Sequence, residues 1–347
     1  MSAAPAAGGA TSGGSMLRAW LEVLRAPLLL SPCADVLAGW SLAFTVAFVR
    51  ASQAGPPAAD AFREPSAALA AWPVLLKTML VGVCLLAAGM AQNAFADLED
   101  DRRRKPGRPL PRGALSVRAV RAASFGLTVI ALVVASGISQ RLLDVAAAIA
   151  ALTWLYHFVL KRWRLPACAA LGVLRGLDLT LGGVALMAAS TGAQPGSAED
   201  ALRFAGLGPV LLTAAGYAAY MAAASLHAST DDEPGSPAWS RLGLGAAVAL
   251  LVILLVLTVA PLLRAGETSP VRWLSAVLAA VAILRLARAW RRLPPPAVTG
   301  VALSNLYLFD ASVVCFGNDE PLALGGGAFI LALFVLGRLF LRIVPPS

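Results

Sequence analysis

The chain has 347 residues, of which 59% are hydrophobic and only 14% are charged, and its mean hydropathy is +0.75. Soluble domains carry about a quarter charged residues, so this composition excludes an ordinary water-soluble globule, a disordered chain and a fibrous repeat. The net charge is +9. The four cysteines of the chain lie singly inside apolar runs, which favours buried thiols over a disulfide or metal framework.

The first fifteen residues differ from the rest of the chain. They are mainly Ala, Gly and Ser without a basic segment, and they predict a flexible N-terminal tail rather than a signal peptide. Residues 16–347 are expected to form a single membrane domain, because runs long enough to cross about 30 Å of hydrocarbon recur throughout them. The runs predict ten spans, at about residues 28–49, 73–95, 118–137, 142–160, 166–190, 204–228, 240–263, 271–290, 297–316 and 323–343.

These runs predict helices rather than strands. They are continuous and rich in Ala and Leu, and helices satisfy their own backbone hydrogen bonds in lipid. The expected fold class is therefore an all-α integral membrane protein with nine to ten transmembrane helices. The number depends on two spans with polar residues: 271–290 contains arginines, and 297–316 contains Asn305 and Asp310, which are candidates for hydrogen bonds between helices.

The positive charges are distributed unevenly between alternate loops. Most of the Lys and Arg residues fall on the side of the membrane that holds the N-terminus, which the positive-inside rule assigns to the cytoplasm. The basic excess is therefore topological, and no nucleic-acid partner is needed to explain it. Two loops on this side, 96–117 and 229–239, carry clustered acidic residues, so we expect the functional site at the cytoplasmic face of the inner membrane.

The end of the second predicted span carries polar side chains at a regular spacing. Asn93, Asp97 and Asp101 are four residues apart, so a helix places them on one face. Carboxylates at a membrane edge are costly unless they are paired or bind a cation, and hard oxygen ligands suit Mg²⁺ together with the phosphate oxygens of a substrate. The alternative is a solvated helix end at which Asp100 and Asp101 pair with the arginines that follow.

A basic, proline-rich stretch follows directly, at residues 102–113, and includes the sequence Arg-Pro-Leu-Pro-Arg-Gly. Cations behind a row of carboxylates form an anion site beside a metal site, which is what a magnesium-bound diphosphate requires. The combined pattern resembles the first signature of the UbiA family of intramembrane prenyltransferases. Other parts of the chain that are similar to this family are residues 24–27, 34–39, 155–162 and 175–178.

The resemblance implies a fold and an activity. The helices would surround a central cavity, and the protein would transfer a prenyl group from an isoprenoid diphosphate to a lipophilic or aromatic acceptor in the membrane, with Mg²⁺ as cofactor. Asn93, Asp97 and Asp101 would bind the metal and the diphosphate, with Asp97 and Asp101 as catalytic residues, and Arg108 would bind the anion. The acceptor, the length of the prenyl chain and the oligomeric state are not defined by the sequence.

The second signature of the family is altered in this chain. UbiA-type enzymes carry another DxxxD at the inner end of the sixth span, where this chain has His227 and Asp231, or Asp231 and Gly235, depending on the alignment. One carboxylate is missing either way, and imidazole is a poor ligand for Mg²⁺. Asp231 and Asp232 are both candidate metal ligands. Asp231 is also a candidate catalytic residue. The alternatives are a polar loop without a ligand role, and a catalytically reduced protein that binds an isoprenoid or lipid without transferring it.

Further polar residues in or near the spans are candidate substrate contacts. Arg175 is expected to face the diphosphate with Asp178 beside it, although a structural ion pair is the alternative. Lys161 and Arg162 are candidate diphosphate ligands, and positive-inside anchoring also explains them. Four residues are candidates for the wall of the cavity: Tyr156, Asp178, Tyr220 and His227. For the two tyrosines the alternative is an aromatic belt at the membrane interface.

Overall fold

The computed structural model describes residues 13–54, 65–189, 198–230, 237–265, 269–317 and 320–343, and all regular structure in these ranges is helical. Most of the predicted tail, together with Asp231 and Asp232, lies outside the described residues. The helices are α1 (Gly13–Val23), η1 (Ala26–Leu28), α2 (Ser31–Ala54), α4 (Pro65–Ala96), α5 (Leu98–Arg104), α6 (Val117–Ser136), α7 (Gln140–Phe158), η2 (Leu160–Arg162), α8 (Arg164–Ala189), α9 (Ala198–Ala228), α10 (Pro237–Ala265), α11 (Pro270–Arg292), α12 (Pro295–Gly317) and α13 (Glu320–Ile343).

The expected all-α membrane architecture is confirmed. Within the described ranges, nine helices are long and apolar enough to cross a membrane, and α13 contains a further, shorter apolar segment at Leu324–Phe340. The two polar spans in doubt are both among the nine, as Pro270–Arg292 and Pro295–Phe316. Asn305 makes the expected contact between helices, because its side-chain amide donates to the carbonyl of Ala282 on α11 at 2.9 Å.

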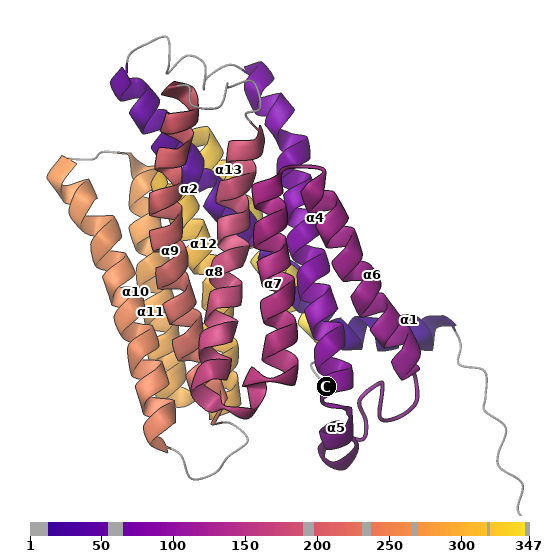
Figure 1. Cartoon of the computed structure of the whole chain (residues 1–347). Helices are drawn as coiled ribbons and strands as arrows, with labels where there is room; N and C mark the ends of the chain where they lie inside the picture. The colour runs from indigo at the N-terminus through magenta and orange to yellow at the C-terminus, as the bar shows by residue number, and fades with distance from the viewer. Residues whose placement is uncertain are drawn as a thin grey trace, which may run out of the picture.

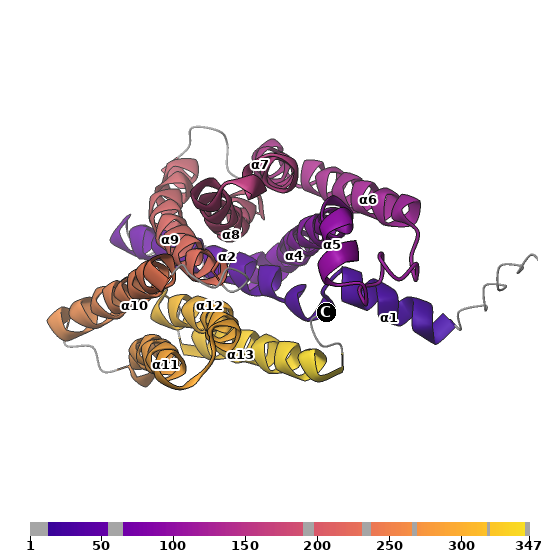
Figure 2. The same ribbon diagram turned by 90° about the horizontal axis from the view of Figure 1, so that it is seen from below.

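The long helices form one bundle, and α2 runs through its middle (Figures 1 and 2). This helix contacts α4, α8, α9 and α12, whereas the other long helices pack mainly on their neighbours in the chain. We call the end of the bundle that carries α5 the α5 end; the lower ends of α8, α9 and α10 lie at this same end in Figure 1.

Glycines allow α2 and α8 to approach each other closely. A Cβ atom on Gly39 of α2 would lie 1.8 Å from the carbonyl oxygen of Leu179, and one on Gly182 of α8 would lie 1.9 Å from that of Val36. Helices in membranes associate through small residues that bring their backbones together, because lipid supplies no hydrophobic drive between them. These two positions therefore set the distance between the central helix and the wall of the bundle.

The short helix α1 lies across the α5 end, roughly perpendicular to the long helices (Figure 1). Its Ala19 and Val23 are buried against Leu110 and Leu115, which belong to the segment after α5, in a small apolar cluster separate from the main core. We call residues 105–116, which connect α5 to α6, the arm. The outward side of α1 is apolar as well, since Met16 and Leu17 are exposed.

We expect Gly39→Ala to destabilise the bundle by about 1–3 kcal/mol, because the added methyl group must push α2 away from α8. Gly126→Ala on α6 is the matched control, since no heavy atom lies within 4 Å of the place that its added Cβ would take and Ala is the better helix former. Thermal unfolding of both variants in detergent checks this. Equal midpoints would show that the two helices do not depend on this contact.

Candidate active site

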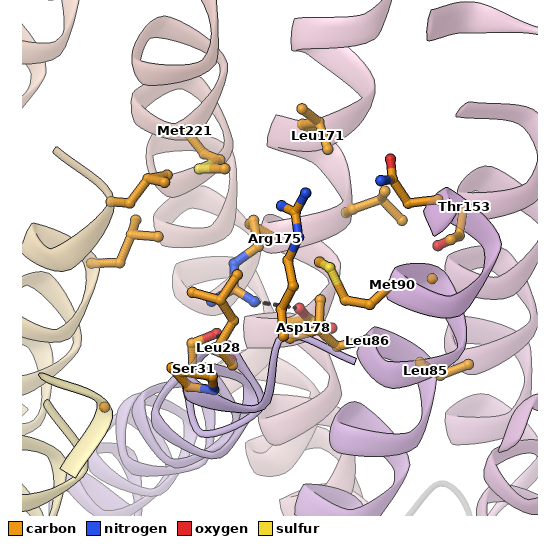
Figure 3. A pocket seen from close by; sticks show the side chains of 18 of the residues that line it. Leu28, Ser31, Leu85, Leu86, Met90, Thr153, Leu171, Arg175, Asp178 and Met221 are labelled. Carbon is orange, nitrogen blue, oxygen red and sulfur yellow. Dashed lines mark hydrogen bonds and ion pairs between the residues drawn. The ribbon is translucent and has the colours of Figure 1, made fainter. Parts of the chain in front are cut away.

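A cavity of about 540 Å³ lies inside the bundle, between η1, α2, α4, α7, α8, α9, α12 and α13. Its walls are mainly apolar, and Figure 3 shows Leu28 and Ser31 on one side of Arg175 and Asp178, with Leu86 and Met90 on the other. At the α5 end the lining becomes polar, with Glu22, Arg25, Asn93, Tyr156 and His157. The cavity thus has an apolar middle and a polar mouth, and a pair of charges deeper in the membrane.

Lys161 joins the first two members of the predicted carboxylate ladder at this mouth. Its ammonium group, on the short helix η2, donates to the amide oxygen of Asn93 at 2.9 Å and to the carboxylate of Asp97. The lysine and the aspartate come from segments 64 residues apart in sequence, and both side chains are only partly exposed. The structure therefore brings together Asn93, Asp97 and Lys161, which the sequence predicts as metal and diphosphate ligands.

The third member of the ladder points elsewhere. The helix does not run through all three residues, because α4 ends at Ala96 and Asp97 stands between α4 and α5 with φ −90° and ψ 2°. Asp101 is buried and accepts two hydrogen bonds, of 2.7 and 2.8 Å, from the guanidinium of Arg108 on the arm. It faces a second, smaller pocket that also contains Glu22, Arg25 and Arg108. The prediction of one straight helical face is corrected in this respect.

Arg25 and Glu22 belong to this mouth and were not proposed from the sequence. Arg25 lines both pockets and is the one described non-glycine residue with positive φ, at 48°. Desolvation and then the nearby Arg108 lower the pKa of Arg25, whereas Asp97 and Asp101 raise it, so a bound anion would favour its charged form. Backbone strain of this kind tends to gather at functional sites. The sequence signal was its place in Arg-Ala-Pro just before the first span.

Glu22 ties α1 to the arm. One of its carboxylate oxygens lies 3.1 Å from Arg112 on the arm, and the other lies 3.1 Å from Arg18 on α1 itself. Its side chain is only 8% exposed, whereas that of Arg18 is 63% exposed. Arg112 also donates to the carbonyl of Gly107 at 3.0 Å, which closes the turn that follows α5. This contact fixes the arm that carries Arg108 over the mouth of the cavity.

The deep pair, Arg175 and Asp178, is part of a buried network. Arg175 lies 3.0 Å from Asp178 and 2.6 Å from Asp35 of α2, and Asp35 accepts a hydrogen bond from Tyr217 of α9. Tyr217 in turn lies 3.5 Å from Asp310 of α12. Arg175 is eleven residues into α8, which is about 16 Å from the start of that helix. It therefore pairs with carboxylates inside the bundle rather than with Asp97 at the mouth.

The remaining candidates divide between the cavity and its surroundings. Tyr156 lines the cavity, as expected. Arg162 is exposed, bonds the carbonyl of Val159 and stacks on Trp163, so it points away from Asp97. Tyr220 and His227 are buried outside the cavity lining: the Tyr220 hydroxyl donates to Ala302 at 2.8 Å, and a ring nitrogen of His227 lies 2.8 Å from Ser240. Neither residue belongs to the lining of the cavity, so the expectation of a cavity contact is corrected for both, although the Nε2 atom of His227 is buried without a hydrogen-bond partner among the described residues.

The oxygen atoms at the mouth suit a magnesium ion. The described residues contain no group of three or more His, Cys, Asp or Glu side chains that would hold a metal by themselves. Asn93 and Asp97 nevertheless offer two hard oxygen donors, which is enough for Mg²⁺ when phosphate oxygens complete its shell. The Lys161 ammonium already places a positive charge between these two side chains, so the site accommodates a cation.

We expect Arg175→Ala to lower the free energy of unfolding by about 3–5 kcal/mol, because it leaves buried carboxylates without their counter-charge. Arg162→Ala, at an exposed position, is the control and is expected to change stability by less than about 0.5 kcal/mol. Thermal unfolding in detergent compares the two variants. If both unfold at the wild-type temperature, Arg175 has no structural role and its ligand role regains support.

Comparison with known proteins identifies the family. The model of the UbiA prenyltransferase family matches residues 65–309, more than half of the chain. The structure resembles that of a digeranylgeranylglyceryl phosphate synthase, with a TM-score of 0.56, 18% identity and coverage of 90% of this chain and 99% of the other. It is also similar to UbiA homologues from Aeropyrum pernix K1, with a TM-score of 0.56, 21% identity and 89% and 98% coverage, and from Archaeoglobus fulgidus, with a TM-score of 0.51, 16% identity and 86% and 100% coverage. No curated protein sequence matched the chain. The family match and the shared fold show that this multi-pass membrane protein belongs to the UbiA prenyltransferase family.

Proposed function

We propose that the protein is a magnesium-dependent intramembrane prenyltransferase, which moves a prenyl group from an isoprenoid diphosphate to a lipophilic or aromatic acceptor. The observation that carries this proposal is the position of Lys161 between Asn93 and Asp97, at the mouth of a cavity with apolar walls. Asn93 lines the cavity, so a negatively charged head group at Lys161 would lie next to an apolar space for its tail. Membership of a prenyltransferase family supports the same reaction class.

The cations of the mouth are arranged to receive a diphosphate. In the absence of substrate, Lys161 is paired with Asp97 and Arg108 with Asp101, so both cations are held in place by carboxylates. When diphosphate binds, Lys161, Arg108 and Arg25 donate to its oxygens and offset its charge. Magnesium bound by Asn93 and Asp97 would neutralise further charge on the leaving group. The site would thus exchange an internal ion pairing for one that includes the substrate.

The reaction breaks the bond between the allylic carbon and the diphosphate oxygen. The diphosphate leaves with the electron pair, the allylic carbocation is attacked by the nucleophile of the acceptor, and the acceptor loses a proton. Leu85, Leu86, Met90, Leu171 and Leu174 line the cavity with hydrocarbon, which keeps water from the cation. The volume of about 540 Å³ is in the range of small-molecule sites. The chain therefore supplies charge neutralisation at one end and exclusion of water beyond it.

We further propose that the α5 end faces the cytoplasm and that the protein lies in the inner membrane. The basic arm, the basic helix η2 that follows α7, the basic last turn of α11 and the arginines near the end of α13 support this orientation through the positive-inside rule. Asp231 and Asp232 follow α9 in the sequence, and α9 ends at the α5 end. We propose Asp231 as a further carboxylate for the metal, with Asp232 as its neighbour.

The altered second signature favours one other function, a UbiA-like protein that binds an isoprenoid or lipid without transferring it. His227 is a poor substitute for the missing carboxylate, because imidazole is a weak ligand for Mg²⁺ and the side chain is buried with its Nδ1 atom 2.8 Å from Ser240. Release of diphosphate from geranylgeranyl diphosphate by the purified protein, measured with and without Mg²⁺, separates the two functions. Metal-dependent release supports the enzyme, and binding without any release supports the alternative.

We expect Asp97→Asn to lower magnesium-dependent diphosphate release by about 10²–10³-fold, because it removes the one carboxylate that lies beside both Asn93 and Lys161. Asp100→Asn is the matched control, since Asp100 is exposed and pairs only with Arg104 within its own helix, at 3.0 Å. Release of diphosphate is measured for both at saturating donor. Equal rates for the two variants would remove the metal role of Asp97.

Lys161 and Arg162 allow a comparison of adjacent cations. Lys161→Met is expected to raise the KM for the diphosphate donor at least about tenfold, because a charged hydrogen bond to phosphate contributes about 1.5–3 kcal/mol. Arg162→Met is expected to leave KM within about twofold, because Arg162 points toward Val159 and Trp163. Steady-state kinetics at fixed Mg²⁺ tests both. A larger effect at Arg162 would contradict the assignment of the mouth.

A further inference from the structure

The cations on the two sides of the cavity differ in their partners. On the side of α1, α4 and α8, Lys161, Arg108, Arg112 and Arg175 are each paired with a carboxylate. On the side of α11 to α13, Asp310 is the sole carboxylate among the described side chains of α10 to α13. It lies in the network around Tyr217 and Asp35, and among the described residues no ion pair joins it to Arg285 or Arg338.

Arg285 is the arginine of this side that contacts the wall of the cavity from behind. It lies within the membrane-spanning part of α11, and its guanidinium donates to the hydroxyl of Ser304 on α12 at 2.8 Å and sits 5.2 Å from the ring centre of Phe334 on α13. Both Ser304 and Phe334 line the cavity. Its other terminal nitrogen, Nη1, is buried and has no hydrogen-bond acceptor among the described residues. A guanidinium at this depth is costly without an anion.

Arg338 brings a second positive charge to the same place. It lies one turn beyond Phe334 on α13, lines the cavity and is exposed, and it is close enough to repel Arg285. No ion pair of Arg338 is found within the part of the chain that the structure describes. One arginine in the wall of the cavity and a second directly behind that wall, in contact with Ser304 and Phe334, form an environment that favours a bound anion.

There is also room for a ligand beside these arginines. Gly300 on α12 precedes Ser304 by one turn and lines the cavity, and no heavy atom lies within 4 Å of where its Cβ would be. Gly337 of α13, next to Arg338, lines the cavity as well. The nearest carboxylate on these helices, Asp310, is six residues beyond Ser304, or about 9 Å along the helix.

Positive-inside anchoring does not account for this arrangement. Arg288, Arg291 and Arg292 follow Arg285 on α11 and are exposed, which is the placement that anchoring requires. Arg285 instead turns inward to Ser304 and Phe334. Arg288 therefore provides a control on the same helix, with the same charge and a different direction.

We propose that Arg285 and Arg338, with Ser304 between them and Gly300 leaving space, form a second anion-binding site in the cavity, which takes the carboxylate or phosphate of an amphiphilic ligand. With respect to the ligand's role this rests on the proposed function: the anion is that of the prenyl acceptor, held across the cavity from the diphosphate at Lys161. An acceptor with a negatively charged group and a nucleophile beside an apolar body fits the two polar sides and the hydrocarbon between them.

Binding of two anionic probes to the purified full-length protein in uncharged detergent tests the site. Benzoate represents a soluble aromatic carboxylate, and phosphatidic acid represents a lipid phosphate, with diacylglycerol as its uncharged counterpart. We expect at least one anion to bind and diacylglycerol not to compete with it. Arg285→Gln/Arg338→Gln is expected to weaken that binding at least about tenfold, and Arg288→Gln to leave it within about twofold. If benzoate binding depends on the two arginines, the anion is that of a soluble carboxylate; if phosphatidic acid binding depends on them, it is that of a lipid phosphate.

Two outcomes would overturn the site. The first is that neither anion binds the wild type. The second is that the double variant and Arg288→Gln behave alike: if both bind as the wild type does, the arginine pair is not the site, and if both are weakened equally, the anion responds to general surface charge. Gly300→Leu retains both arginines and is expected to block binding by filling the space, so the test does not depend on the fold of the double variant. These measurements contain no prenyl donor. Binding that depends on the arginine pair without diphosphate release in the separate assay would refute the proposed function and leave the site standing.

Discussion

The contact between α2 and α8 is the constraint on which the rest of the bundle depends. Gly39 and Gly182 let the two backbones meet, and each stands one helical turn beyond an aspartate, Asp35 and Asp178 respectively. The approach that the glycines permit therefore places both carboxylates around Arg175. A helix in the middle of a membrane bundle must bury its charge against a partner, and this geometry provides one. The closed inner part of the cavity follows from this contact.

The mouth of the cavity follows another principle. Its ion pair between Lys161 and Asp97 joins segments that are far apart in the chain and is only partly buried. Such pairs contribute little to stability, so exchanging them for contacts to a ligand costs little. The deep network and the mouth thus use the same residue types for different purposes, the former to hold helices together and the latter to receive charge.

Prediction from the sequence succeeded where the evidence is local. Apolar runs predicted the spans, including both polar ones, and the spacing of Asn93 and Asp97 placed these two side chains on one side of a helix end. Lys161 is 64 residues away in sequence and was a separate candidate, and the structure brings it to both side chains. Prediction failed where direction is decided by tertiary contacts. The break at Asp97 turns Asp101 toward Arg108, and Tyr220 bonds a neighbouring helix. Asp35 lies in a motif that resembles the family, but its partner Arg175 is 140 residues away, and no pattern in one sequence reveals it.

The position of α1 has a mechanical consequence. Glu22 on α1 forms an ion pair with Arg112 on the arm, and the apolar side chains of α1 pack on Leu110 and Leu115. The helix and the arm therefore move as one piece. The outward side of this helix presents Met16 and Leu17, which suits the boundary between water and lipid. A displacement of α1 at the membrane surface would therefore carry the arm and Arg108 with it, which connects the position of this helix to the entrance of the cavity.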